Sequence, residues 1–315
     1  MYTKLKILLA CLCLSLLLSS CDRSQPTQSG YIQFAEGQLF FQKFGTGEPI
    51  LIVHGGPGLD HSYLLPQMLE LAKDHELIFY DQRGSGNSLQ TKIDTQHINL
   101  EQFTKDLETL RLALGLKKFI LLGHSWGGLL AMDYATKYPD TLSALILITS
   151  APADYAGQQA FVQSYQTRTM PIKDKITALS QYAALEKLEA QQINDTYRTL
   201  FSVYFYDPKK AEQLTLNMSK ASALSGFKVM NVMAQTSWLQ PKTNLFPALK
   251  NLKVPTLVIA GQEDIVPVKT ATAIQAAIPH AKISYLEHCG HFPYIEQPAL
   301  LWKTIRTFLQ DNRGE

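Results

Sequence analysis

The stretch FILLGHSWG, residues 119–127, decides the fold class of this chain. Its four apolar residues predict a buried strand, and the glycine-flanked serine after them predicts a sharp turn into a helix. Side chains at positions 123 and 127 would collide on such a turn, and glycine occupies both. The turn exposes the hydroxyl of Ser125 and directs the backbone N–H of Trp126 towards a carbonyl that this hydroxyl could attack. Ser125 is therefore the candidate nucleophile, and Trp126 a candidate oxyanion-hole donor.

A carboxylate and an imidazole follow Ser125 in the chain order that serine hydrolysis on such a sheet uses. The reaction needs an imidazole that accepts the hydroxyl proton and a carboxylate that orients the imidazole. The sequence GQED at 261–264 follows one strand-like apolar run, and EHCGHFP at 287–293 follows the next. Because the carboxyl ends of parallel strands meet at the ligand-binding edge of a sheet, we expect the three residue types at one edge.

Two glycine-rich motifs follow apolar runs earlier in the chain. The motif HGGPG at 54–58 follows the run 50–53, and DQRGSGNS at 81–88 follows the run 77–80. A glycine-rich turn lets backbone N–H groups approach a substrate oxygen closely, which makes Gly56 the candidate second oxyanion donor.

Together, HGGPG, DQRGSGxS and GHSWGG resemble the motifs of the proline iminopeptidase-like branch of the α/β-hydrolase fold family. The resemblance spans the predicted catalytic domain and implies a triad of Ser125, Asp264 and His291. The family's histidine loop is more similar to the surroundings of His291 than to those of His288. Its Gly-x-x-Asp turn selects Asp264 over Glu263, which we expect to face solvent.

We expect three charged or titratable residues in the glycine-rich motifs to support the structure rather than take part in the reaction. We expect Asp81 and Arg83 to form a charged pair that braces a turn, and His54 to orient its loop through hydrogen bonds.

Strand-like and helical patterns alternate along most of the chain. Helical spacing runs from 100 to 116, and the segment 31–44 predicts an opening hairpin. The pattern predicts a doubly wound, mostly parallel sheet formed by 31–152 and 248–315, and the resemblance implies that this sheet has the α/β-hydrolase fold. The buried parallel strands are expected at 50–53, 77–80, 119–122, 145–148, 257–259 and 283–286.

The alternation stops between 153 and 247, where the family inserts a helical cap. We expect most cap aromatics to pack in the core or lid and a minority to touch substrate: Phe161, Tyr165, Tyr197, Phe201, Tyr204, Phe205 and Tyr206. Proline iminopeptidases hold the substrate ammonium with cap glutamates, and the corresponding motifs are missing, since Leu239-Gln240 follows Trp238. The cap carboxylates are expected on solvated faces: Asp174, Glu186, Glu189, Asp195, Asp207 and Glu212. Aminopeptidase specificity is therefore not expected from the cap.

The N-terminus resembles a bacterial lipoprotein signal peptide. Lys4 and Lys6 precede an apolar stretch, 7–18, that is shorter than the roughly 20 residues of a membrane-spanning helix. The sequence LSSC at 18–21 resembles a lipobox, which implies removal of residues 1–20 and a lipid-bearing Cys21. A plain secretory signal is the alternative. Asp22, if the source is Gram-negative, implies the periplasmic face of the inner membrane.

Neither the segment after the predicted lipid anchor nor the overall charge indicates a macromolecular partner. Residues 21–30 predict a polar, flexible tether. The chain has 29 basic and 27 acidic residues, so the balance favours neither nucleic acid nor a polybasic membrane contact. Removal of Cys11 and Cys13 with the signal and lipidation of Cys21 would leave Cys289 as the remaining thiol, without an intrachain disulfide.

These features predict an exported, membrane-tethered serine hydrolase that opens an ester or amide bond of a small molecule or short peptide through an acyl-enzyme. No metal or organic cofactor is expected, and oligomeric state is not predicted. One alternative is a proline iminopeptidase, and another is a non-catalytic binding or sensor protein on the same scaffold.

Overall fold

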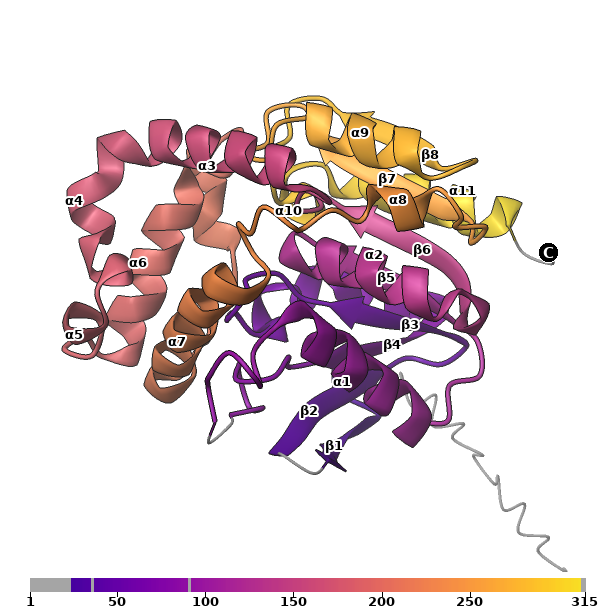
Figure 1. Cartoon of the computed structure of the whole chain (residues 1–315), viewed down its shortest axis with the longest axis horizontal. Coiled ribbons are helices and arrows are strands. Elements are labelled where there is room, and N and C mark those ends of the chain that lie inside the picture. Colours follow the sequence, from indigo (N-terminus) through magenta and orange to yellow (C-terminus); the bar gives the residue numbers. More distant parts are fainter. Residues whose placement is uncertain (1–23, 35–36, 90–91, 313–315) are drawn as a thin grey trace, which may run out of the picture.

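The computed structural model describes residues 24–34, 37–89 and 92–312, so the predicted signal peptide and Cys21 lie outside it. Within this part, one sheet runs in the order β1-β2-β4-β3-β5-β6-β7-β8 (Figure 1). Its strands are β1 Gln28–Phe34, β2 Gly37–Phe44, β3 Glu48–Val53, β4 His75–Tyr80, β5 Phe119–His124, β6 Leu142–Ile148, β7 Thr256–Gly261 and β8 Lys282–Leu286.

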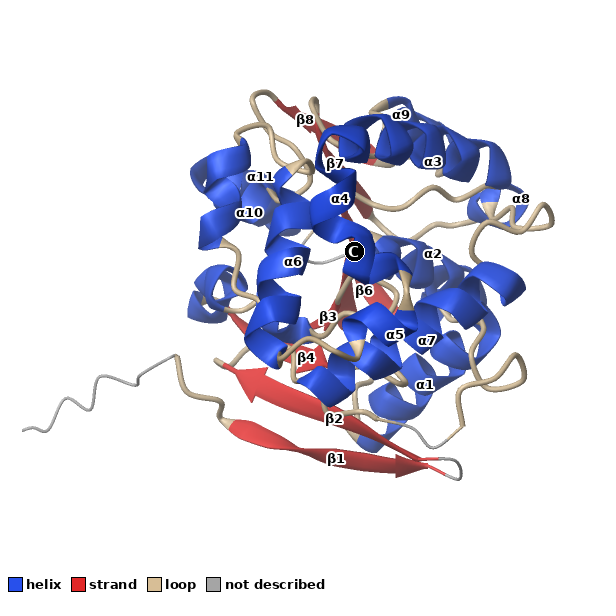
Figure 2. Cartoon of the chain, turned by 90° about the vertical axis from the view of Figure 1, so that its left-hand side faces the viewer, coloured by secondary structure: helices blue, strands red, loops and turns tan. Residues whose placement is uncertain are grey.

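In the sheet order from β4 to β8 neighbouring strands pair in parallel, and each contains one of the six apolar runs predicted as parallel strands. The run 283–286 was expected to be buried, and this was wrong: β8 is an edge strand in which only Leu286 is buried. The predicted hairpin is confirmed, since β1 and β2 pair antiparallel and β2 joins the edge of β4 (Figure 2). The hairpin begins earlier than expected, because residues 28–30 pair with 41–43 of β2. The last three residues of the predicted tether therefore belong to a strand.

Helices cover both faces of the sheet. The α-helices are α1 Leu100–Ala113, α2 Trp126–Lys137, α3 Tyr155–Thr169, α4 Lys173–Ile176, α5 Tyr182–Leu185, α6 Ala190–Ser202, α7 Lys220–Thr236, α8 Phe246–Leu249, α9 Lys269–Ala277, α10 Pro293–Glu296 and α11 Pro298–Asp311. Short 3₁₀ helices lie at His61–Tyr63, Pro66–Lys73, Pro139–Thr141, Met170–Ile172, Thr177–Ser180 and Pro208–Gln213.

Alternate residues of a central strand enter two separate cores. Ile50 and Ile52 of β3 belong to the core that includes α11, whereas Leu51 and Val53 belong to the core that includes α1, α2 and α9. Two buried faces explain why these strands are continuous apolar runs rather than alternating ones. The structure therefore confirms the doubly wound α/β-hydrolase architecture.

In the described segment 153–247 helices alternate with loops, and its one strand-type pairing is an isolated β-bridge between Asp154 and Asn244. Two backbone hydrogen bonds beside this bridge, from Tyr155 to Thr243 and from Leu245 to Ala153, hold the outgoing and returning chains together. The helices α3 to α7 project to one side of the sheet (Figure 1), and α8 packs against α2 and α9. Among the described helices, none is long and apolar enough to cross a membrane.

Candidate active site

Ser125 lies on the turn between β5 and α2, as the motif predicts. Its backbone has φ 57° and ψ −123°, a conformation that a non-glycine residue rarely adopts. A Cβ atom at position 123 would overlap the carbonyl of Gly127, and one at position 127 would overlap the carbonyl of Val53. The two glycines therefore permit the close backbone approach that this turn requires.

The backbone of Ser125 is fixed on both sides, while its hydroxyl is accessible. Its N–H donates to the carbonyl of Ile148, and its carbonyl accepts from the N–H groups of Gly128 and Ala151. Ser125 lines a pocket between the edge of the sheet and the cap helices, and its hydroxyl makes no hydrogen bond to the described residues. Catalytic hydrogen bonds in ligand-free sites are commonly long and tighten when substrate binds.

His291 and Asp264 meet behind this pocket. Nδ1 of His291 lies 2.8 Å from Oδ1 of Asp264, and both side chains are buried. The same oxygen accepts a hydrogen bond from the backbone N–H of Val266. Since the carboxylate holds Nδ1, the other ring nitrogen is free to exchange a proton on the pocket side, which His291 also lines.

The two neighbouring candidates lie elsewhere. His288 is exposed, with its ring 5.2 Å from that of Tyr206. Glu263 was expected to face solvent, and this was wrong: it is half-buried, and Oε2 accepts the backbone N–H of Cys289 at 3.0 Å. Glu263 thus braces the loop that precedes His291, while Asp264 contacts the imidazole itself.

The loop containing Gly56 lies beside Ser125. A Cβ on Gly55 would be 3.1 Å from the Cβ of Ser125, and both Gly56 and Trp126 line the pocket. Among the described residues, the backbone N–H groups of Gly56 and Trp126 have no hydrogen-bond acceptor. The N–H of Gly55, by contrast, donates to the hydroxyl of Tyr63 at 2.6 Å. Gly56 and Trp126 therefore remain available to a substrate oxygen.

His54 orients this loop through hydrogen bonds, as expected. Nε2 accepts from the backbone N–H of Gln82 at 3.0 Å, so Nδ1 carries the proton that it donates to the carbonyl of Gly55 at 2.8 Å. Burial lowers the pKa of His54, which keeps the ring neutral. The side chain of Gln82 also links the loop to α2, since it donates to the carbonyl of His54 and accepts from the indole N–H of Trp126.

Asp81 and Arg83 brace turns, but with other partners than predicted. The carboxylate of Asp81 accepts from the ring of His61 at 2.6 Å and from the backbone N–H of Asn87 at 2.8 Å. Arg83 forms a bidentate ion pair with Asp106 on α1, at 2.6 and 2.8 Å. The two side chains therefore contact different parts of the chain: Asp81 contacts His61 and the backbone of Asn87, and Arg83 contacts α1.

A buried hydrogen-bond chain joins the glycine loop to the histidine loop. The hydroxyl of Tyr63 accepts from Gly55 and donates to Nδ1 of His124 at 2.7 Å, and Nε2 of His124 donates to the carbonyl of His291 at 2.9 Å. Burial, followed by the nearby His291, lowers the pKa of His124 far below its usual value. Tyr63 and Gln82 were not predicted from the sequence; the motif DQR contains Gln82, but nothing in the sequence indicates the role of Tyr63.

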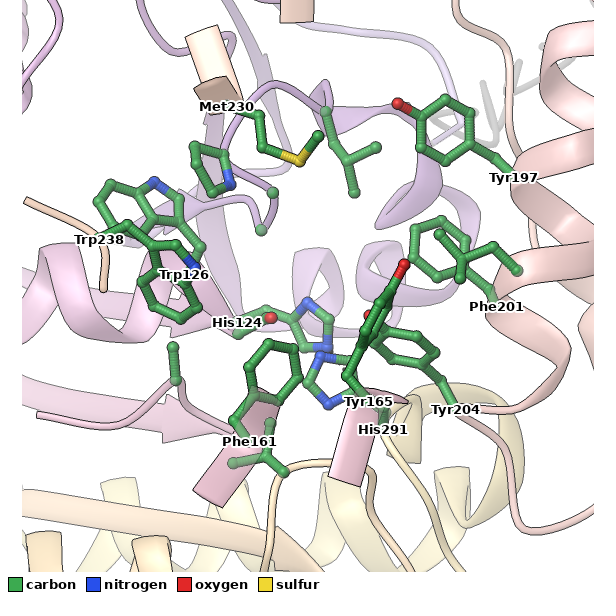
Figure 3. A pocket seen from close by; sticks show the side chains of 18 of the residues that line it. His124, Trp126, Phe161, Tyr165, Tyr197, Phe201, Tyr204, Met230, Trp238 and His291 are labelled. Atoms are coloured by element: carbon green, nitrogen blue, oxygen red, sulfur yellow. Dashed lines mark hydrogen bonds between the residues drawn. The ribbon is translucent and has the colours of Figure 1, made fainter. Parts of the chain in front are cut away.

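The pocket has a volume of about 420 Å³, and no acidic or basic side chain lines it apart from the imidazoles of His124 and His291 (Figure 3). Its cap-side wall consists of Phe161, Val162, Tyr165, Gln166, Leu179, Tyr197, Leu200, Phe201, Tyr204, Met230, Trp238 and Leu239.

Most of the cap aromatics pack against the core, as expected, and how many of them touch substrate stays a prediction. Five of the seven line the pocket, because α3 and the end of α6 turn their aromatic faces inwards. Phe205 is buried elsewhere, and Tyr206 is exposed. The expectation for the cap carboxylates is confirmed: none lines the pocket, and all are exposed except the half-buried Asp207.

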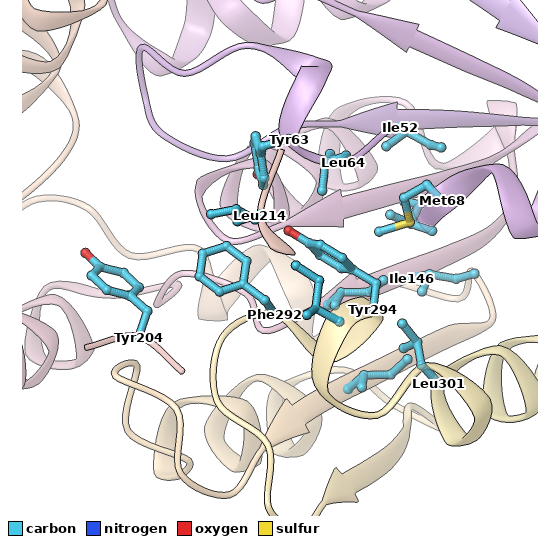
Figure 4. Close-up of a cluster of buried hydrophobic side chains, with 14 of the residues drawn as sticks. Ile52, Tyr63, Leu64, Met68, Ile146, Tyr204, Leu214, Phe292, Tyr294 and Leu301 are labelled. Atoms are coloured by element: carbon cyan, nitrogen blue, oxygen red, sulfur yellow. The ribbon is translucent and has the colours of Figure 1, made fainter. Parts of the chain in front are cut away.

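Aromatic packing connects the cap to the loop that carries His291. The ring of Phe292 stacks on Phe205 with centroids 4.6 Å apart and meets Phe201 edge-on at 5.6 Å. Tyr204 and Leu214 of the cap join the same buried cluster (Figure 4). The backbone N–H of His291 also donates to the carbonyl of Tyr204 at 2.8 Å. The cap therefore helps to position the candidate proton acceptor.

The described residues contain no cluster of three side chains suited to a metal ion.

Comparison with known proteins gives the family. The model of the alpha/beta hydrolase fold matches residues 48–298, and the chain therefore belongs to this family of hydrolases. The chain is similar to a proline iminopeptidase of Heyndrickxia coagulans, with 28% identity over 288 residues that cover 89% of this chain and 98% of the relative. A proline iminopeptidase of Lactobacillus helveticus is 29% identical over 292 residues, covering 84% and 94% of the two chains.

Solved structures agree on the fold. The proline iminopeptidase of Mycobacterium smegmatis superposes with a TM-score of 0.66 at 22% identity, over 90% of this chain and 98% of that chain. A thermophilic esterase from Thermogutta terrifontis superposes with a TM-score of 0.63 at 26% identity, over 90% and 99%.

Proposed function

We propose that this hydrolase cleaves an ester or amide bond of a small, neutral substrate through an acyl-enzyme on Ser125. The observation that carries the proposal is one pocket that contains Ser125, the Asp264-bound His291 and, apart from imidazoles, no charged side chain. An apolar cavity of this size suits a small molecule, and burying a charged group in it without a partner would be costly.

Each residue has a defined role in the proposed reaction. The Oγ atom of Ser125 attacks the carbonyl carbon and passes its proton to His291, whose cation Asp264 stabilises. The N–H groups of Trp126 and Gly56 donate to the oxyanion, each donor contributing about 3 kcal/mol in the transition state. His291 then gives the proton to the leaving alcohol or amine. Water attacks the acyl-enzyme with the same residue as base, which releases the acid and restores Ser125.

A proline iminopeptidase is the second candidate, because the curated relatives named above carry that activity in their names. The lining of the pocket does not favour this second candidate. An N-terminal prolyl substrate brings an ammonium, and no carboxylate lines the cavity to compensate that charge. The ester candidate needs no such partner.

The lipid anchor is part of the proposal. A lipid-bearing Cys21 would tether the enzyme to a bacterial membrane after export, at the periplasmic face of the inner membrane in a Gram-negative source. Mass spectrometry of the purified N-terminus tests this: a diacylated or triacylated Cys21 supports the anchor, and an unmodified N-terminus elsewhere supports a plain secretory signal.

One assay separates the candidate activities. The full-length protein in lipid nanodiscs is given p-nitrophenyl acetate, p-nitrophenyl butyrate and proline β-naphthylamide, with Ser125→Ala as the control. Ser125-dependent ester cleavage without prolyl amide cleavage supports the proposal. Efficient prolyl amide cleavage would favour the iminopeptidase. Failure of a fluorophosphonate probe to label Ser125 in folded protein would contradict both and leave a binding protein on a hydrolase scaffold.

A further inference from the structure

Three tyrosines of the cap line the pocket, and their hydroxyls have no hydrogen-bond partner among the described residues. Tyr165 lies on α3, Tyr197 on α6, and Tyr204 directly after α6. No described residue hydrogen-bonds to any of the three hydroxyls, and Tyr204 is only 9% exposed. In Figure 3, Tyr165, Tyr197 and Tyr204 lie on the same side of the cavity as Phe201.

These tyrosines differ from the two tyrosines whose hydroxyls are buried in the core without a partner. The oxygens of Tyr80 and Tyr294 are fully enclosed in the core, where a ligand cannot reach them. The three cap tyrosines line the same cavity as Ser125. A hydroxyl held in apolar surroundings without an acceptor costs free energy. A ligand that offers an acceptor forms the missing hydrogen bond when it binds, which favours binding.

The electrostatic surroundings select a neutral ligand group. Burial and the nearby hydroxyl of Tyr165 raise the pKa of Tyr197 to about 12 and that of Tyr204 well above its usual value, so both stay protonated donors near neutral pH. No acidic or basic side chain lines the cavity to compensate a charged ligand group. Neutral oxygen acceptors such as ketone, ether or second ester oxygens therefore fit this wall.

The hydroxyls occupy one side of the pocket. The ring of Tyr204 lies 5.3 Å from the ring of His291, and its carbonyl accepts the N–H of His291. Phe161 lies beside Tyr165, with ring centroids 6.1 Å apart, and contacts Trp238 at 6.0 Å, so the lining becomes apolar from Phe161 through Trp238 to Met230 (Figure 3). A substrate in this pocket would place a polar atom against the tyrosines and an apolar part against Trp238 and Met230.

We propose that the hydroxyls of Tyr165, Tyr197 and Tyr204 form a subsite for a neutral hydrogen-bond-accepting oxygen of the substrate, several bonds from the carbonyl that Ser125 attacks. This inference rests on the proposed function in one respect: it assigns the substrate class of the same pocket. The enzyme would then favour oxygen-containing acyl or leaving groups over hydrocarbon chains of equal length.

Matched substrates test the subsite. The p-nitrophenyl esters of 4-methoxybutanoate and hexanoate differ by one oxygen in place of one methylene, as do those of 6-methoxyhexanoate and octanoate. The readout is the ratio of kcat/KM values, ether over alkyl, for the full-length protein in nanodiscs. We expect the triple variant with Tyr165→Phe, Tyr197→Phe and Tyr204→Phe to lower this ratio roughly fivefold or more at one chain length. Tyr182→Phe, in a cap tyrosine outside the pocket, should leave the ratio unchanged.

A binding assay separates failure of the subsite from failure of the hydrolase proposal. In a Ser125→Ala background, the corresponding methyl esters are titrated by the fluorescence of Trp126 and Trp238, two pocket-lining residues of the three tryptophans. The same three Tyr→Phe changes should weaken ether binding relative to alkyl binding by a similar factor. A ratio unchanged in both assays, or lowered equally by Tyr182→Phe, would overturn the subsite. Loss of hydrolysis with the binding preference retained would overturn the hydrolase proposal alone.

Discussion

The carboxylate of Glu296 accepts the backbone N–H of Gly290, the residue before His291, at 2.7 Å. Its other oxygen accepts the N–H groups of Tyr206 and Asp207 in the cap, at 2.9 and 3.2 Å. One buried side chain on α10 therefore holds the histidine loop and the cap to each other. Movement of the cap away from the sheet would break contacts on both sides of this carboxylate.

Glu296→Gln should weaken this link, because the amide offers one acceptor oxygen where the carboxylate offers two. A backbone N–H left without an acceptor costs about 1–3 kcal/mol, so we expect a lower melting temperature and roughly tenfold slower hydrolysis. Glu287→Gln, an exposed position on the same loop, is the matched control. Equal behaviour of the two variants would contradict the role of Glu296.

The effect of Glu296→Gln on stability should depend on pH. Burial raises the pKa of Glu296 above its usual value of 4.5, so the folded protein binds this proton more tightly than the unfolded chain. The stability that Glu296 contributes therefore falls as pH rises from about 4.5 through the raised pKa. The difference in melting temperature between the wild type and Glu296→Gln should be larger at the acid end of this window. A difference in melting temperature that grows as pH rises would contradict this prediction.

The assignment of the triad carboxylate can be tested with a neighbouring pair. Asp264→Asn removes the charge that holds Nδ1 of His291, whereas Glu263→Gln alters only the support of Cys289. We expect Asp264→Asn to lower kcat by roughly a thousandfold with little change in KM, and Glu263→Gln to lower it less than tenfold. Steady-state kinetics on p-nitrophenyl butyrate measures both. A larger loss in Glu263→Gln would move the catalytic role to Glu263.

The strands and turns that could be predicted from the sequence are those whose local residue pattern is compatible with a single structure. Strands buried on both faces require unbroken apolar runs, so 50–53 and 119–122 were predicted within the observed strands. Glycines at 123 and 127 are needed because backbone carbonyls occupy the space of their side chains. The candidate nucleophile, acid and histidine could be predicted because each lies in the turn or loop that follows a strand of the sheet.

Partners that come from distant elements could not be predicted in this way. Arg83 pairs with Asp106, a residue of α1 that local sequence does not bring near it. The helical spacing of Tyr165 and Tyr197 is the same whether an aromatic face covers a core or a cavity, so the sequence did not indicate which cap aromatics line the pocket. Tyr63 lies in a short 3₁₀ helix between two motifs, and its role depends on the approach of His124 from another strand.

The bridge made by Tyr63 leads to a further prediction. Tyr63→Phe leaves the buried N–H of Gly55 without an acceptor and Nδ1 of His124 without a donor. We expect a loss of stability of about 1–3 kcal/mol and a lower kcat, because the loop that carries Gly56 loses its anchor. Denaturant unfolding and steady-state kinetics give the two values. Tyr31→Phe, at a tyrosine that is 47% exposed, should change neither, and a Tyr63→Phe enzyme with unchanged kcat would show that the bridge has no part in positioning Gly56.

The cap also touches the oxyanion loop through two glycines. A Cβ added to Gly226 of α7 would overlap the carbonyl of Gly58, at the end of the HGGPG loop. In an exposed helix, Gly→Ala would stabilise by about 1 kcal/mol, so the direction of the effect distinguishes a crowded site from an open one. We expect Gly226→Ala to push α7 and the loop apart and to lower kcat roughly tenfold or more, since a hydrogen-bond donor displaced by a fraction of an ångström loses most of its effect on the transition state. Asn231→Ala, on the exposed face of the same helix, should retain full activity. Full activity in Gly226→Ala would mean that the loop adjusts without moving Gly56. It would contradict the prediction that the cap helps to position the loop that carries Gly56.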